Sequence, residues 1–158
     1  MQMPVPTKEH AWLQKFVGEW ETEIEVYMEP GKPPMKAKGS HRDHMVGGFW
    51  LISEGRNHEF PYHFVLTLGY DAPRSEYVGT WIDTMTSHIW KYQGTVNSAG
   101  TILTLETEGP SPMSPDKFSK FREVTEFKSK DHRYLTSSML SGDGKWSTVL
   151  TVSSRRKT

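Results

Sequence analysis

The 158-residue sequence contains no cysteine and no excess of either charge, with 19 lysines and arginines against 19 aspartates and glutamates. Without cysteine there is no disulfide, thiolate nucleophile, zinc finger or iron–sulfur cluster. A formal net charge of zero provides no basic surface of the kind that attracts nucleic acid or an anionic membrane. We therefore expect neither nucleic acid nor a membrane as a partner.

Long apolar runs are also lacking. No stretch approaches the roughly 18 apolar residues of a membrane span, and residues 1–8 contain no apolar segment typical of a signal peptide. Only 35% of the residues are hydrophobic, but 12% are aromatic. Disordered chains have few aromatic residues and a high net charge, so this composition indicates a folded protein with its apolar mass in large rings. These features predict one soluble, cytoplasmic domain over residues 1–158.

Helical periodicity is confined to a segment near the N-terminus, from about Thr7 to Val17. One stripe of that segment is apolar and carries Trp12, Leu13, Phe16 and Val17. Thr7 can cap the start of a helix, and Gly18 follows its last residue. The segment predicts a single short amphipathic helix.

From Gly18 onward the pattern alternates with a period of two, which is typical of strands. Turn signals, such as those at residues 30–34 and 97–100, separate about ten strand-like runs. The runs are too close together for crossover helices, so the sheet must be antiparallel. About ten such strands form a sandwich or an up-and-down β-barrel, and closure into a barrel removes the exposed edges.

Charge pairing predicts which face of the first hairpin is inward. If paired residue numbers sum to 63, Glu25 lies opposite Lys38 on the outer face. The inner face then carries Trp20, His41 and Asp43. A slip of two residues would change the partners and keep the faces, so the prediction concerns the facing alone.

His41 and Asp43 are the first candidates for chemistry. An inward histidine beside an inward aspartate suits a general base with its orienting carboxylate, or a polar anchor for a ligand. The commoner role of such a pair is structural. Metal binding is not expected, because His44 faces away from His41 and because Pro61 prevents a helix at residues 58–63.

A second candidate set is aromatic. Its inward members are predicted to be His88, Trp90 and Tyr92, together with Trp81 and Phe64 on neighbouring strands. Rings with a few polar groups suit the lining of a ligand cavity. They suit an ordinary barrel core equally well, and the sequence leaves both interpretations open.

The turn at residues 47–48 leaves the next strand ambiguous. A two-residue hairpin would turn Glu54 and Arg56 inward, where they would be candidate site residues. A three-residue loop or a bulge would turn Leu51 and Ser53 inward and leave both charges on the surface, since a slip of one residue exchanges the faces.

Arg122 is the remaining candidate. It could anchor a ligand carboxylate in a bidentate manner, although an exposed strand arginine is the commoner outcome. Its neighbours Phe121, Glu123, Thr125 and Phe127 share the opposite face of the strand. No nucleotide-binding glycine loop, nucleophile elbow or calcium loop occurs in the sequence.

Short segments spread in order over nearly the whole chain carry a family resemblance. They include His10-Ala11-Trp12-Leu13, Val17-Gly18-Glu19-Trp20, Gly47-Gly48-Phe49-Trp50-Leu51, Leu68-Gly69-Tyr70-Asp71 and Arg122-Glu123-Val124-Thr125. On these segments the chain resembles the 1579 family of domains of unknown function, whose members are similar to lipocalin and fatty-acid-binding (calycin-like) barrels. The resemblance implies an all-β barrel of about ten strands, with the N-terminal helix over one end. It supplies no activity and no catalytic residues.

Barrels of this size commonly hold one small ligand, which favours a module that binds a small apolar or amphipathic molecule. The residues expected to line the site are Trp20, His41, Asp43, Phe64, Trp81, His88, Trp90, Tyr92 and Arg122. One alternative is a structural or interaction protein with a filled core that associates as a homodimer. The others are an enzyme that transfers protons with an inward histidine and carboxylate, and a haem-binding barrel with one axial histidine. No other cofactor is expected.

Overall fold

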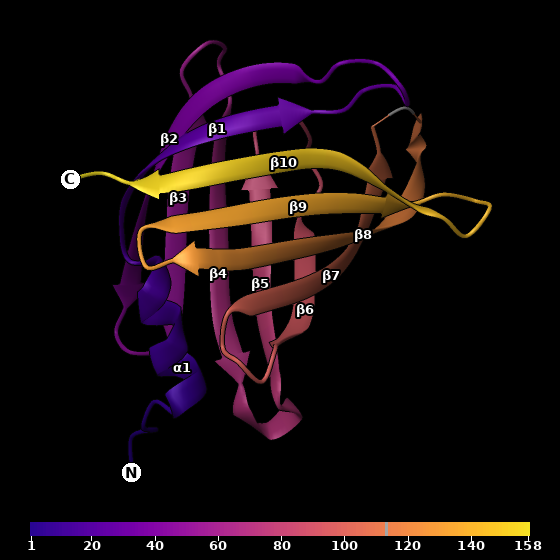
Figure 1. Cartoon of the computed structure of the whole chain (residues 1–158). Helices are drawn as coiled ribbons and strands as arrows, with labels where there is room; N and C mark the ends of the chain where they lie inside the picture. Colours follow the sequence, from indigo (N-terminus) through magenta and orange to yellow (C-terminus); the bar gives the residue numbers. More distant parts are fainter. Residues whose placement is uncertain (113) are drawn as a thin grey trace.

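Ten antiparallel strands follow two short helical turns in the computed structural model, which describes residues 1–112 and 114–158 (Figure 1). The helical elements are α1 (Lys8–Trp12) and the 3-10 turns η1 (Leu13–Phe16) and η2 (Ala72–Arg74). The strands are β1 (Gly18–Val26), β2 (Met35–Val46), β3 (Trp50–Asn57), β4 (His63–Asp71), β5 (Glu76–Asp83), β6 (Trp90–Val96), β7 (Ile102–Ser111), β8 (Ser114–Ser129), β9 (His132–Leu140) and β10 (Trp146–Arg156).

The sheet is a closed up-and-down barrel. Each strand pairs with the next one along the chain, and β10 pairs with β1 to complete the ring. Figure 1 shows β1, β10 and β9 crossing in front of β3, β4 and β5 at a steep angle. The closed antiparallel order confirms the fold class expected from the sequence, and it gives each described strand a neighbour on both sides.

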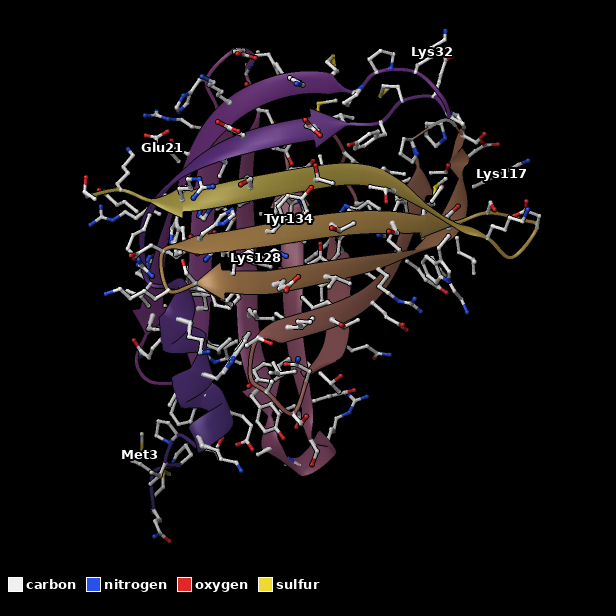
Figure 2. The ribbon with its side chains drawn as sticks, in the orientation of Figure 1. Met3, Glu21, Lys32, Lys117, Lys128 and Tyr134 are labelled. Carbon is white, nitrogen blue, oxygen red and sulfur yellow. The ribbon has the colours of Figure 1, made fainter. Side chains whose placement is uncertain are left out.

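The two ends of the barrel differ. At one end, here called the helix end, α1 and η1 lie against the strands beside the β2–β3 turn (Figure 1). The opposite end, here called the open end, carries the loops at residues 27–34, 58–62, 84–89 and 141–145. Figure 2 shows Lys32 and Lys117 at this open end, far from Met3. A ligand that enters the barrel would therefore do so from the open end.

The N-terminal segment forms the predicted amphipathic turn in two parts, with α1 continuing into η1. The backbone N–H of Thr7 donates to Nδ1 of His10 at 2.9 Å, which satisfies one free donor at the helix start. Leu13 and Phe16 point into the barrel and are buried. Neither this segment nor any other helix in residues 1–112 and 114–158 is long and apolar enough to cross a membrane.

An apolar core fills the helix end. Its buried members are Leu13, Phe16, Trp20, Leu51, Leu68, Tyr77, Leu103, Leu105 and Phe127. Burial of a large apolar side chain contributes about 1.5–3 kcal/mol to stability. This cluster therefore closes one end of the barrel and fixes the floor beneath the rest of the interior.

The first hairpin keeps the predicted facing but pairs two residues away from the predicted register. Glu25 pairs with Lys36 rather than Lys38, and Trp20 pairs with His41. A shift of two residues leaves every side chain on its original face. Trp20, His41 and Asp43 are therefore inward, as the sequence predicts, and all three are buried.

The β2–β3 turn is the three-residue alternative. Val46 pairs with Trp50, and Gly47 adopts a left-handed φ of 59° that an L side chain rarely adopts. Leu51 consequently faces inward, whereas Glu54 and Arg56 are exposed on the outer face. The two-residue hairpin is the wrong alternative.

Candidate functional site

A buried polar cluster lies directly above the apolar core. Its members come from four strands and are here called the floor cluster: His41, Asp43, Ser53, Arg133 and Ser154. None of them is more than 8% exposed. Buried polar groups need partners because each lost hydrogen bond leaves an uncompensated desolvation penalty.

Asp43 is the centre of the floor cluster. Its Oδ1 accepts hydrogen bonds from Ser53 Oγ and His41 Nδ1, both at 2.7 Å, and its Oδ2 accepts one from Arg133 Nη2 at 2.7 Å. Burial alone would raise the pKa of Asp43. The positive charge of Arg133 and the two hydrogen bonds outweigh burial and hold that pKa below its ordinary value. Asp43 is therefore an ionised and fully partnered carboxylate.

The hydrogen bonds of His41 define its tautomer. Nδ1 donates to the Asp43 carboxylate, so in the neutral ring Nε2 accepts from the hydroxyl of Ser154 at 3.2 Å. Burial lowers the pKa of His41, and the nearby Arg133 charge acts in the same direction against the Asp43 hydrogen bond. His41 is consequently a neutral imidazole at pH 7.

Arg133 was not identified from the sequence as a candidate residue. Its guanidinium lies 4.6 Å from the centroid of Phe16 and 4.5 Å from that of Trp20, so it is held by cation–π contacts as well as by Asp43. The signal available in the sequence is a single charged residue at an inward position of a strand, in alternation with Leu135. Strand alternation does not identify the carboxylate that pairs with Arg133, because Asp43 lies 90 residues away along the chain.

The order Asp43–His41–Ser154 is that of a carboxylate, imidazole and hydroxyl relay in a hydrolase. Access decides against that chemistry, because the Ser154 residue is only 3% exposed and no substrate carbonyl can reach its hydroxyl. The floor cluster is therefore a satisfied structural network with His41 at its upper surface.

Aromatic side chains line the wall above the floor cluster. Phe64 on β4 and Trp81 on β5 stack with ring centroids 4.3 Å apart and an interplanar angle of 7°. Asp83 lies beside this pair, and its Oδ2 accepts hydrogen bonds from Trp81 Nε1 at 2.9 Å and from the Tyr62 hydroxyl at 3.1 Å. Burial and the Asp83 charge raise the pKa of Tyr62, which keeps the phenol protonated. This wall thus presents ring faces and a hydrogen-bonded carboxylate.

Trp90 continues the wall toward the open end. Its ring packs over Gly109, where an added Cβ would lie 2.1 Å from the indole, and it contacts Phe121 edge to face at a centroid distance of 5.2 Å. His88 lies at the rim, where its ring contacts Trp90 and its Nε2 is 3.1 Å from the carbonyl oxygen of Glu108. The glycine is what allows the indole to lie against the wall.

Glu123 is the second inward charge that the sequence did not identify as a candidate. It pairs with Leu105 and Ser137 across the sheet, and its Oε1 accepts a hydrogen bond from the Ser137 hydroxyl at 3.0 Å. Burial raises the pKa of Glu123 to about 7, and the Ser137 hydrogen bond only partly opposes this. The available signal was its position in alternation with Phe121 and Phe127 on an apolar face.

Large side chains on the inward faces of the open half are incompletely buried. They remain half-buried, and they include Ile24, Phe64, Leu66, Trp81, Trp90, Tyr92, Leu135 and Val152. Strand alternation places these side chains on the inward faces of their strands, so we infer that their exposed area faces the inside of the barrel. The incomplete burial of these side chains indicates accessible space above the floor cluster, with aromatic, aliphatic and acidic groups around it.

Arg122 lies outside this space, which excludes it from an interior site. It pairs with Glu106 across the outer face, with Arg122 Nη2 3.2 Å from Glu106 Oε1, and its guanidinium lies 4.2 Å from the ring centroid of Trp146. The physical reason is strand alternation, which turns position 122 outward whenever Glu123 is inward. Trp20 is also removed from the accessible space, because it is fully buried in the core.

A groove of about 670 Å³ lies along β2, β3 and the loop at residues 58–62, where outward side chains line it together with His41 and Tyr62. Its lining includes Arg42, Glu54, Arg56, Phe60 and His63. Its charges have both signs, and Glu54 and His63 pair within it at 2.9 Å. Ligand sites are mainly apolar and enclose their ligand, so the interior matches those properties better than this groove does.

His41 does not fit the role of an axial haem ligand. An axial ligand needs a free ring nitrogen that faces the interior. Both ring nitrogens of His41 are engaged by Asp43 and Ser154, and Nε2 of His88 is within hydrogen-bond distance of a backbone carbonyl at the rim. In the described ranges, 1–112 and 114–158, no three histidine or acidic side chains are grouped to hold a metal ion.

Solved structures similar to this chain are barrels. Rv2717c from M. tuberculosis has 13% sequence identity and a TM-score of 0.67, covering 98% of this chain and 100% of that chain. The S-type phycobiliprotein lyase CPES from Guillardia theta has 15% identity and a TM-score of 0.56, with 97% and 99% covered. At these identities the likeness establishes the fold alone.

Sequence comparison gives the family. A search of curated protein sequences gives no match. The family of proteins of unknown function DUF1579 matches residues 5–156, which is nearly the whole chain. The segments that suggested this family from the sequence lie in α1, β1 and the β2–β3 turn at the helix end, and in β4 and β8. The chain belongs to the DUF1579 family.

Proposed function

We propose that this protein binds a small amphipathic molecule inside the barrel, above the floor cluster. The observation that carries the proposal is the incomplete burial of large inward side chains such as Phe64, Trp81 and Leu135. A barrel built only for stability gains by filling its interior, because interiors of folded proteins are close-packed. Accessible rings inside a closed wall are instead typical of a ligand site.

The chemistry of the wall supports an amphipathic ligand over a purely apolar one. The Phe64–Trp81 stack and Trp90 offer ring faces, while Asp83, Glu123 and the Tyr92 hydroxyl are polar groups on the same interior. The part of the chain that the structure describes contains no hydrogen-bond partner for the Tyr92 hydroxyl, which leaves it free for a ligand. A few polar groups among rings orient a ligand and give specificity.

Proton-transfer catalysis by His41 and Asp43 is less well supported. Their 2.7 Å contact satisfies the geometry of a base with its orienting carboxylate. His41 is only 8% exposed, however, and the atom that would take a proton already accepts a hydrogen bond from Ser154. In a binding barrel, His41 and Asp43 would instead form part of the hydrogen-bonded polar surface beneath the ligand.

The test is native mass spectrometry of the purified protein, followed by denaturation and organic extraction. We expect a reproducible additional mass that dissociates on denaturation and is identified in the extract. The variant Trp81→Leu should lose this mass, because Trp81 lines the interior. Trp50→Leu is the matched control, since Trp50 lies on the outer face, and it should retain the mass. A mass that survives Trp81→Leu unchanged would contradict an interior site.

A further inference from the structure

We propose that the molecule bound in the barrel is an organic cation, with its positive group beside Glu123 and its apolar body against the Phe64–Trp81 stack. This inference rests on the proposed binding function and specifies the charge of the ligand. It starts from the charges that face the interior and from which of them already have partners.

The floor cluster contributes no net charge. Asp43 and Arg133 form an ion pair at 2.7 Å, and His41 between them is neutral. Arg133 is also enclosed between the rings of Phe16 and Trp20. Its guanidinium is therefore not available to the carboxylate of an anionic ligand.

The wall above the floor cluster carries negative charge that no protein cation balances. Asp83 accepts its hydrogen bonds from Tyr62, Trp81 and the backbone N–H of Met85, all of which are neutral donors. Glu123 accepts from the neutral hydroxyl of Ser137. Across residues 1–112 and 114–158, neither carboxylate lies within 4 Å of a lysine, arginine or histidine nitrogen. A cation that enters the interior is the missing counter-charge.

Glu123 has a free oxygen for that cation. Its Oε1 is used by Ser137, whereas Oε2 has no hydrogen-bond partner in the described part of the chain. The side chain is half-buried, so it reaches the accessible space. An unpaired carboxylate inside a protein is costly, and an ion pair with a ligand offsets part of that cost.

The neighbouring rings suit the same ligand. Phe64, Trp81, Trp90 and Tyr92 lie on the inward faces of β4, β5 and β6 and are incompletely buried, and aromatic rings, tryptophan above all, attract organic cations. An ammonium group is recognised by aromatic rings together with a carboxylate, and Glu123 and the neighbouring rings provide both. A neutral ligand would gain from the rings and leave Glu123 unpaired.

The ionisation of Glu123 supports the assignment. With a pKa of about 7, the carboxyl changes charge near neutral pH. The groups close to it are Ser137 on β9, Tyr92 on β6 and Tyr62 in the loop after β3, and the two tyrosines stay protonated because burial raises the pKa of each. A cation should therefore bind more tightly as Glu123 loses its proton.

The experiment is calorimetric titration with three naphthyl probes of similar shape: naphthylmethyl-trimethylammonium, naphthylmethanol and naphthylacetate. At pH 8 we expect the permanent cation to bind about tenfold more tightly than the alcohol, and the anion most weakly. Glu123→Gln should reduce the affinity for the cation about tenfold and leave that for the alcohol unchanged. Glu126→Gln, on the same strand but outward and paired with Lys128, should bind all three probes as the wild type does.

A second measurement needs no variant. Because the trimethylammonium group does not titrate, its affinity for the wild type should rise about fivefold between pH 6 and pH 8 as Glu123 ionises. Equal or tighter binding of the alcohol, or an affinity for the cation that is the same in Glu123→Gln, would overturn the cation assignment and leave the binding function intact. Failure of all three probes, together with a native mass equal to that of the polypeptide alone, would overturn both.

Discussion

Asp43 and Arg133 lie 90 residues apart in the chain and 2.7 Å apart inside the barrel. The ion pair joins β2 to β9, and both side chains are buried. Since neither group has access to bulk water, each depends on the other for compensation of its charge. A substitution of either residue alone therefore leaves the charge of the other buried without its partner.

We expect Asp43→Ala to destabilise the protein by about 3–5 kcal/mol, because it leaves the Arg133 charge buried and unpaired. Urea unfolding followed by tryptophan fluorescence measures the change. The double variant Asp43→Ala, Arg133→Met removes both charges and should be more stable than the single variant. A single variant within about 1 kcal/mol of the wild type would contradict the role of this ion pair.

The protonation state of His41 gives a second prediction. Burial lowers its pKa below the ordinary value of 6.5, so the ring should remain neutral at pH 6.5 with its proton on Nδ1. Long-range nitrogen–proton correlation spectra of the imidazole report both the tautomer and the titration midpoint. In Asp43→Asn the Nδ1–H loses its carboxylate acceptor, so the proportion of that tautomer should fall. A midpoint above 6.5 in the wild type would be inconsistent with this environment.

Glu123→Gln should be more stable than the wild type at pH 8. The folded pKa of about 7 exceeds the ordinary value of 4.5, so the folded state binds this proton more tightly than the unfolded state does. The stability from that proton is fully present below pH 4.5 and is lost as the pH rises through 7. Allowing for the half-buried side chain, we expect the variant to be more stable by about 1–2 kcal/mol at pH 8.

The same comparison at pH 5 provides the control for Glu123. There the folded carboxyl is protonated, and the difference between Glu123→Gln and the wild type should largely disappear. Thermal unfolding at the two pH values measures both quantities. Glu126→Gln is the matched control, because Glu126 lies on the same strand with its outward side chain paired with Lys128. If Glu123→Gln were less stable than the wild type at pH 8, the prediction would be wrong, because the folded protein would then stabilise the ionised Glu123 carboxylate.

Gly109→Ala tests how the wall holds Trp90. The new methyl group would meet the indole at 2.1 Å, so the ring must move into the interior. Overpacking of this kind costs about 1–3 kcal/mol. We expect a corresponding loss of stability and a change in the near-ultraviolet circular dichroism of the tryptophans. Gly142→Ala, in the open-end loop with no atoms near the added carbon, should leave the near-ultraviolet spectrum unchanged.

Local alternation allowed the sequence to predict much of the barrel. The period of two in β1 and β2 placed Trp20, His41 and Asp43 on one face, and the structure has all three inward. The apolar stripe through Leu13 and Phe16 predicted the turn that closes the helix end. These features depend on residues a few positions apart, whose directions are set by the backbone itself.

The sequence by itself thus determined the strands, their inward faces and the helix that closes one end. Only the tertiary structure decided that β2 and β3 join through three residues, because a change of one residue in a turn inverts the faces and the glycines at 47 and 48 permit either length. Only closure of the barrel brought Arg133 to Asp43, and it left Glu123 without a cationic partner among the residues that the structure describes. These contacts join distant segments of the chain, and their distances follow from how the whole sheet curves and closes rather than from the pattern of any one strand.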